Sequence, residues 1–355
     1  MNAEKGVMAT SAAFSPLPLR VPDPVVTILP SSNMAQRVVW SPNDAYVVTM
    51  SRVAEIAGMA RVMIWKDMKT VAAYVGSYNA RPEEDGVACT GDGRLWFVNR
   101  DGSVVLVAHP EMGGGVEVLS RRFASPHVFA GASDGSIFIQ AGDMCPRVLL
   151  VATGRSRIVS SSENCTGLGV DPHGKSVVIV SDAWVAGGNY VGTLQLRPLP
   201  HLKSPVIRRA SCGARFSNPV YSPDGSRIAV GCSKGHVHVF TSSALEERDW
   251  ISPPRAPSEI LALAWSTNGH LCAVGMHKML LMIDMRTGNT IRIFDDMHHD
   301  VVSLAASPDS RRLLVNTHGV SADIAEQKHG AAIFDFGSPN FGTDAATHWA
   351  DASFG

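Results

Sequence analysis

The residues of this sequence that could support catalysis are a repeated serine motif and a few clustered histidines. Residues 131–135 (Gly-Ala-Ser-Asp-Gly) and 231–235 (Gly-Cys-Ser-Lys-Gly) both fit the G-x-S-x-G pattern of hydrolase nucleophiles. That chemistry needs a strand, a sharp turn and then a helix beside the oxyanion hole. Each copy is followed instead by an alternating apolar run, at 136–140 and 236–240, which is typical of a strand. We therefore interpret both motifs as hairpin turns and expect no catalytic residue.

The histidines are the next candidates, because imidazole binds metals. His236 and His238 stand two residues apart on a predicted strand, so both side chains would lie on one face. No third or fourth ligand follows at the spacing of a zinc site. We expect these histidines to be structural, and we expect neither a metal nor a cofactor.

The elements that carry these residues belong to a repeat. A turn signal of the type Ser-Pro-Asp-Gly recurs between short apolar runs about 44 residues apart on average, which is close to one four-stranded propeller blade. The turn begins at Ser41, Thr90, Ser125, Asp171, Ser222, Ser266 and Ser307. The runs before and after each turn are four to seven residues long and rich in β-branched and aromatic residues, as strands are.

Two segments of the repeat resemble the blade sequences of the WD-repeat family. They run from Tyr221 to Gly235 and from Ile283 to Gly288, and the resemblance covers residues 25–337 as seven units. The Trp-Asp pair of that family is replaced here by Trp65-Lys66, Ile283-Asp284 and Phe334-Asp335. The resemblance implies an all-β fold, a seven-bladed β-propeller of the WD40/YVTN-like type.

The chain ends fit closure of such a ring. The seventh unit has three strand-like runs, and residues 25–29 form a lone run that could supply the fourth, closing the ring with an N-terminal strand. We expect a flexible, proline-rich arm at 1–24, one propeller at 25–337 and a tail at 338–355. Long connections are expected at 52–60, 182–190 and 318–329. The first and last of these are ring neighbours, so that edge is the first place to look for binding.

A second resemblance concerns Arg208 and Arg209. The stretch 207–210 (Ile-Arg-Arg-Ala) resembles the phosphoinositide-binding propellers (PROPPINs), whose hallmark is an apolar residue followed by Arg-Arg-Gly. Ala210 stands in place of the glycine. The resemblance implies that the two guanidinium groups hold lipid phosphates. It gives one alternative function, a phosphoinositide-binding membrane or autophagy adaptor.

A third resemblance is to the propellers of the eukaryotic translation initiation factor 2A family. It rests on the spacing of residues 178–196, with their Gly-Gly-Asn-Tyr-Val-Gly core, and of residues 304–336. Residues 338–355 contain no Lys or Arg, whereas that family carries a Lys/Arg-rich C-terminal extension. The resemblance implies another alternative, a translation-initiation or ribosome-associated factor.

The composition narrows the class of partner. Lys and Arg number 31 against 32 Asp and Glu, a net charge of −1, so the chain lacks the basic excess of a dedicated nucleic-acid binder. No run of 18 apolar residues occurs, and we expect no transmembrane segment. The six cysteines lie at least 20 residues apart without a C-x-x-C pair, which is typical of reduced thiols. We expect a cytoplasmic protein without sequence-specific DNA binding.

These observations together favour a non-catalytic WD-repeat scaffold for protein–protein interactions within a larger, multi-subunit assembly. Aromatic and arginine side chains are the usual anchors of such interfaces. The predicted partner-binding residues are Arg52, Trp184, Tyr190 and Trp250.

Overall fold

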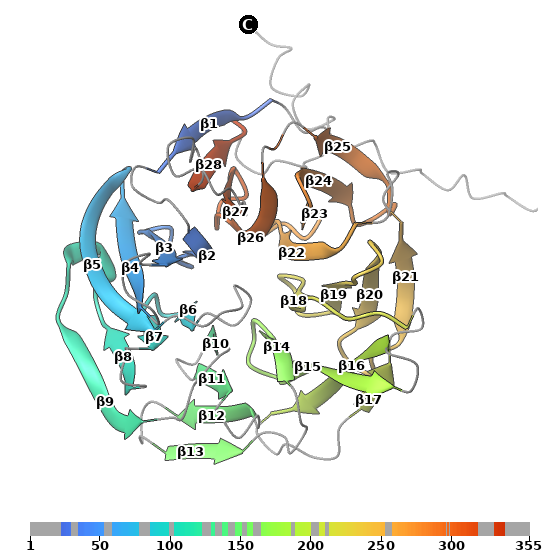
Figure 1. Ribbon diagram of the computed structural model, residues 1–355, viewed down its shortest axis with the longest axis horizontal. Coiled ribbons are helices and arrows are strands. Elements are labelled where there is room, and N and C mark those ends of the chain that lie inside the picture. The colour runs from blue at the N-terminus through green and yellow to red at the C-terminus, as the bar shows by residue number, and fades with distance from the viewer. Residues whose placement is uncertain are drawn as a thin grey trace, which may run out of the picture.

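The structure of the chain is a computed structural model of an all-β protein (Figure 1). It describes residues 23–29, 35–52, 59–77, 86–98, 103–122, 129–131, 137–140, 146–150, 155–158, 165–185, 189–199, 206–209, 213–252, 258–295, 297, 299–318 and 330–337. Residues 1–22 and 338–355 lie outside this set, so the predicted arm and tail stay predictions. The strands form seven four-stranded sheets arranged as a ring (Figure 1), which confirms the all-β propeller class.

Six of these sheets, blades A to F, are each made of four consecutive strands. Blade A consists of β2 (Ala35–Trp40), β3 (Val47–Arg52), β4 (Met59–Lys66) and β5 (Lys69–Ser77). Blade B consists of β6 (Val87–Cys89), β7 (Leu95–Val98), β8 (Ser103–Val107) and β9 (Val116–Arg122), with a 3₁₀ turn at Pro110–Met112. Blade C consists of β10 (Phe129–Gly131), β11 (Ile137–Gln140), β12 (Pro146–Leu150) and β13 (Arg155–Ile158).

The second half of the chain repeats this plan. Blade D consists of β14 (Cys165–Val170), β15 (Ser176–Val185), β16 (Asn189–Pro198) and β17 (Val206–Arg209). Blade E consists of β18 (Val220–Tyr221), β19 (Arg227–Gly231), β20 (Val237–Thr241) and β21 (Glu247–Ile251). Blade F consists of β22 (Ile260–Trp265), β23 (Leu271–Met276), β24 (Met279–Asp284) and β25 (Thr290–Phe294). All described pairings are antiparallel, as expected for strands joined by hairpins.

The remaining sheet, the composite blade, draws on both ends of the chain. It joins β26 (Asp300–Ala306), β27 (Arg312–His318) and β28 (Ala331–Asp335) to β1 (Val25–Ile28), in the order β1-β28-β27-β26. The expectation of a seven-bladed propeller is corrected in one respect: six blades, rather than seven, are each formed by one continuous stretch of sequence. The remaining sheet is assembled from both chain ends, because the last repeat supplies only three strands, and this confirms the predicted closure by an N-terminal strand. β1 pairs with β28, from Val25 opposite Asp335 to Ile28 opposite Ala332, and closes the ring.

The recurring turn has one geometry throughout the described blades. Its fourth residue has a positive φ at Asp44, Gly93, Gly174, Gly225, Gly269 and Ser310. Its first residue is buried at Ser41, Thr90, Asp171, Ser222, Ser266 and Ser307. In blade E the Ser222 hydroxyl donates to Asp224 Oδ1 at 2.5 Å and accepts from the backbone N–H of Arg227 at 2.9 Å. A buried hydroxyl therefore replaces water as the partner of the turn's backbone.

One predicted loop is in fact a strand pair. β15 and β16 stay in register as far as Val185 opposite Asn189, so residues 182–185 and 189–190 are paired strand residues and not part of an insertion loop. Val, Trp and Tyr, which favour strands, occupy this segment. The other two predicted connections are 52–60 and 318–329, and their residues 53–58 and 319–329 lie outside the described residues.

The core lies between neighbouring blades and not within any one of them. One apolar cluster joins blades A and B, others join D with E, E with F, and F with the composite blade, and another joins the composite blade to blade A. Among the described residues, blades A, E and F and the composite blade therefore each bury both faces against their neighbours. In the described part of the chain no helix is long and apolar enough to cross a membrane.

Candidate functional site

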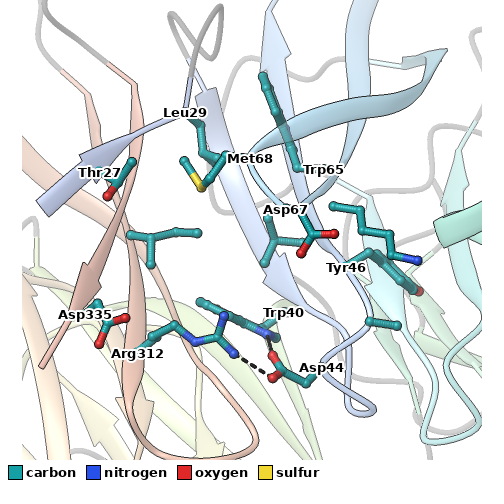
Figure 2. Close-up of a pocket in the computed structure, with 14 residues that line it drawn as sticks. Thr27, Leu29, Trp40, Asp44, Tyr46, Trp65, Asp67, Met68, Arg312 and Asp335 are labelled. Carbon is teal, nitrogen blue, oxygen red and sulfur yellow. Dashed lines mark hydrogen bonds and ion pairs between the residues drawn. The ribbon is translucent and has the colours of Figure 1, made fainter. Parts of the chain in front are cut away.

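A cavity of about 320 Å³ opens where the composite blade meets blade A. We call it the seam cavity. Its lining residues come from three separate parts of the chain: Thr27, Leu29, Trp40, Asp44, Ala45, Tyr46, Val47, Trp65, Lys66, Asp67, Met68, Arg312, Ile333 and Asp335. Figure 2 shows Thr27 and Asp335 on one side, Trp65 and Asp67 on the other, and Arg312 with Trp40 and Asp44 between them.

Three residues of two blades form one fixed unit of the cavity wall. Asp44 accepts a hydrogen bond from Trp40 Nε1 at 2.7 Å and pairs with Arg312 Nη2 at 2.5 Å (Figure 2). The Arg312 guanidinium carbon lies 4.9 Å from the centroid of the Trp40 ring, within the range of a cation–π interaction. Asp44 is the left-handed residue of its turn, with φ 59°, which aspartate tolerates better than most residues. The turn geometry therefore places the carboxylate on the partner blade's arginine.

A second carboxylate of the cavity is also neutralised. Asp335 pairs with Arg311 through two contacts, Nε to Oδ1 at 2.8 Å and Nη2 to Oδ2 at 3.0 Å. The hydrogen bonds from Arg311 hold the pKa of this carboxyl below its usual value, despite partial burial. The cavity thus has two carboxylates that are already occupied by arginines of the composite blade.

The wall from blade A is the hairpin turn between β4 and β5. Asp67 has φ 48° and Met68 has φ 63°, so two consecutive residues other than glycine are left-handed. Such a turn favours Asn-Gly, and a methionine in this conformation costs about 1–2 kcal/mol. Met68 packs in part against the buried cluster around Leu29 and Trp65. That packing holds the strained turn at the cavity.

β1 has a second hollow on its other face. Val26 and Ile28, which alternate with Thr27, line a cavity of about 480 Å³ beside Phe294 and Phe334. Arg292 lies over the Phe294 ring at 5.2 Å and pairs with Asp23. Four residues of one edge strand therefore separate two hollows, and three of them, Val25, Val26 and Ile28, are exposed apolar residues.

Two side chains of blade E that could support catalysis, Cys232 and His238, lie in the core. His238 Nδ1 is 2.6 Å from Glu247 Oε1, and the imidazole is also hydrogen-bonded to Cys232. Burial lowers the pKa of His238, but the bonds to Cys232 and Glu247 outweigh it and raise the pKa overall. The exposed fraction is 1% for His238 and 0% for Cys232. This arrangement resembles a nucleophile–base–acid chain in its order of groups, but a substrate has no access to a thiol so deeply buried.

The serine motif of blade E is a hairpin turn, as predicted. Gly235 N–H donates to the carbonyl of Cys232 at 3.0 Å, and β19 and β20 pair on either side. Residues 132–136 of the other copy lie outside the described residues. Across the part of the chain that is described, no three His, Cys, Asp or Glu side chains gather closely enough to hold a metal ion.

The predicted binding residues lie on blades A, D and E. Arg52 ends β3 in blade A, and Trp250 lies in β21 of blade E. Trp184 and Tyr190 are direct partners in the β15–β16 pair. Arg208 and Arg209 are the last two residues of β17, opposite Leu194 and Thr193. These facts concern the backbone alone, because the six side chains lie outside the described set, so their binding roles stay predictions.

The sequence analysis pointed to the edge between the first and last units but missed the residues of the seam cavity. Asp67 and Met68 gave no signal, because Asp-Met is not a recognised left-handed pair. Arg312 could have been found, since it follows the recurring turn as Arg227 does in blade E. Comparison of the sequence with protein-family models and with curated proteins found no match. The propeller is therefore shown by the structure, and membership of the WD-repeat family remains a prediction.

Proposed function

We propose that this protein is a non-catalytic interaction scaffold that binds a protein partner at the seam cavity. The observation that carries the proposal is the cavity itself, which is formed between two blades and walled by a strained hairpin. Backbone strain that persists in a folded protein is concentrated at functional sites.

Two carboxylates that line the cavity are already paired with arginines, which supports a binding role over a catalytic one. Asp44 and Asp335 are held by Arg312 and Arg311, so neither carboxylate is placed as a general base. Tyr46 is buried, and its hydroxyl donates to the carbonyl of Gly93 at 2.8 Å. Burial raises the pKa of Tyr46, which keeps the phenol neutral. The paired carboxylates and the buried phenol fix the shape of the cavity, so that a side chain of a partner can bind inside it.

The test is to fill the cavity from β1. Thr27 is exposed and lines the cavity, so Thr27→Trp is expected to occupy it without disturbing the core. Val25 is 69% exposed on the same strand and is not among the lining residues, so Val25→Trp is the matched control. Tagged wild-type protein is captured from its own cells, and its stoichiometric partners are measured by mass spectrometry. We expect Thr27→Trp to lose a partner that Val25→Trp keeps. Equal recovery with both variants, at equal thermal stability, would refute the proposal.

A second candidate function is binding of phosphoinositide headgroups near Arg208 and Arg209. Arg209 lies opposite Thr193 in the β16–β17 pair. Gly192, which precedes Thr193, donates its N–H to the carbonyl of Ala214 at 2.7 Å. Arg215, which follows Ala214, is exposed, and its backbone is hydrogen-bonded to the β19–β20 hairpin turn that contains Lys234.

That junction consists of two hydrogen bonds between Ser233 and the Arg215 backbone, at 3.0 and 3.2 Å. Lys234 is also exposed, so two exposed basic side chains, Arg215 and Lys234, lie on segments next to the sheet whose last strand ends in Arg208 and Arg209. Guanidinium and ammonium groups bind phosphate oxygens by charge-assisted hydrogen bonds. Flotation with phosphoinositide liposomes tests this function. Arg208→Ala with Arg209→Ala should abolish flotation, whereas the exposed Arg248→Ala should not. Equal flotation with and without phosphoinositide would exclude lipid binding.

A further inference from the structure

The hairpin turn at the seam cavity has a second destabilising feature besides its two left-handed residues, a pair of like charges. Lys66 and Lys69, on either side of Asp67-Met68, are direct partners across β4 and β5. Like charges placed opposite each other destabilise a strand pair. The same turn carries two left-handed residues without a glycine. Local features that oppose stability are expected where a sequence serves binding.

The charges of the hairpin stay unpaired beside the ion pairs of the composite blade. Arg312 contacts both Asp44 and Asp309, and Arg311 pairs with Asp335. Lys66, Asp67 and Lys69 have no ion-pair partner among the residues that the structure describes, and both lysines are exposed. The hairpin therefore presents two ammonium groups and one carboxylate to solvent. An approaching segment therefore meets two ammonium groups and one carboxylate on this hairpin, beside the cavity.

The interior of the cavity has a different character. Leu29, Val47, Met68 and Ile333 contribute apolar surface, and Met68 is only half-buried. A volume of about 320 Å³ is at the lower end of the range for ligand pockets. It suits one or two apolar side chains and is too small for a folded element.

We infer that the partner of the seam cavity is an acidic protein segment, which places an apolar side chain inside the cavity and its carboxylates on Lys66 and Lys69. The inference rests on the proposed function and specifies its chemistry. Apolar burial would supply most of the affinity, and the two lysines would supply selectivity and a faster association. The interaction should therefore weaken as salt is raised.

The test uses the full chain and a displayed library of random peptides. Peptides are selected on the wild-type protein, and those that still bind Thr27→Trp are discarded. We expect the remaining peptides to carry two or more acidic residues around a leucine, methionine or aromatic residue. A synthetic peptide of that kind should bind at least tenfold more weakly to Lys66→Glu with Lys69→Glu. Lys175→Glu, an exposed lysine of blade D, is the charge control and should not change binding.

The outcomes separate the two proposals. If cavity-dependent peptides are basic or uncharged, the acidic partner is wrong while binding at the seam stands. If no cavity-dependent peptide is selected, a linear acidic segment is excluded. If, in addition, Thr27→Trp recovers the same cellular partners as Val25→Trp, the proposed function fails as well. Equal thermal stability of the lysine variants and the wild type is required, and either lysine variant can be replaced by Lys→Gln to keep the test free of folding defects.

Discussion

Arg312 of the composite blade lies over the ring of Trp40 in blade A, with 4.9 Å between the guanidinium carbon and the ring centroid. Arg227 of blade E lies over Trp265 of blade F in the same way, at 5.0 Å. In both pairs the arginine follows the recurring turn of one blade and the tryptophan ends the first strand of the next. The joint that closes the ring is therefore built like a joint between blades that are continuous in sequence.

Arg312→Ala should lower the free energy of unfolding by about 1–2 kcal/mol, because it removes the cation–π contact and leaves Asp44 with one partner fewer. Arg312→Lys should recover less than half of this loss, since an ammonium group lacks the planar guanidinium face. Urea unfolding followed by tryptophan fluorescence measures the change. Arg311→Ala, which breaks a surface pair with Asp335, is the control and should have a smaller effect. Wild-type stability of Arg312→Ala would show that the seam does not depend on this contact.

The protein should lose stability as the pH rises through the titration of His238. Burial lowers the pKa of this imidazole, but its bonds to Cys232 and Glu247 raise it overall. A folded-state pKa above the unfolded value means that protonated His238 stabilises the fold. That contribution is complete below about pH 6.5 and is lost as pH rises through the folded-state pKa. Urea midpoints from about pH 5.5 to about pH 8.5 should fall for the wild type. The fall should be smaller for Glu247→Gln, and an identical profile for both proteins would contradict the assignment.

The recurring turn is the part of the fold that the sequence predicts best, and local chemistry explains why. Ser222, Pro223, Asp224 and Gly225 carry their own hydrogen bonds and their own left-handed residue, so four residues determine the turn. The seam cavity depends on Thr27, Trp40, Asp67 and Arg312, which are far apart in the sequence. Their proximity follows from ring closure, which the lone strand-like run at residues 25–29 predicts, and from the strained β4–β5 turn, which no local pattern encodes.

Cys165 and Cys272 should not react with alkylating reagents in the folded protein at neutral pH. Burial raises the pKa of each thiol to about 12, and hydrogen bonds to the backbone offset this only in part. The thiolate is the reactive form, and at neutral pH it is almost absent. Peptide mapping after iodoacetamide treatment should find both residues unmodified in native buffer and modified in concentrated urea. Rapid modification in native buffer would show that blades D and F open readily.

The spacing between blades depends on glycines at fixed places on the second strand. A Cβ added to Gly275 of β23 would lie 2.6 Å from the carbonyl oxygen of Val301, in β26 of the composite blade. One added to Gly231 of β19 would lie 2.5 Å from Ile260 Cβ, in β22 of blade F.

Neither contact is possible without moving one blade away from the next. Because overpacking in a core costs about 1–3 kcal/mol, Gly275→Ala should destabilise the protein by that amount. Gly115→Ala, where no atom lies within 4 Å of the new methyl group, should leave stability unchanged or raise it slightly. The melting temperatures of Gly275→Ala and Gly115→Ala, each compared with that of the wild type, test this prediction. If the two variants melt together, the close approach of the blades at Gly275 is not a constraint, and the blades have room to shift.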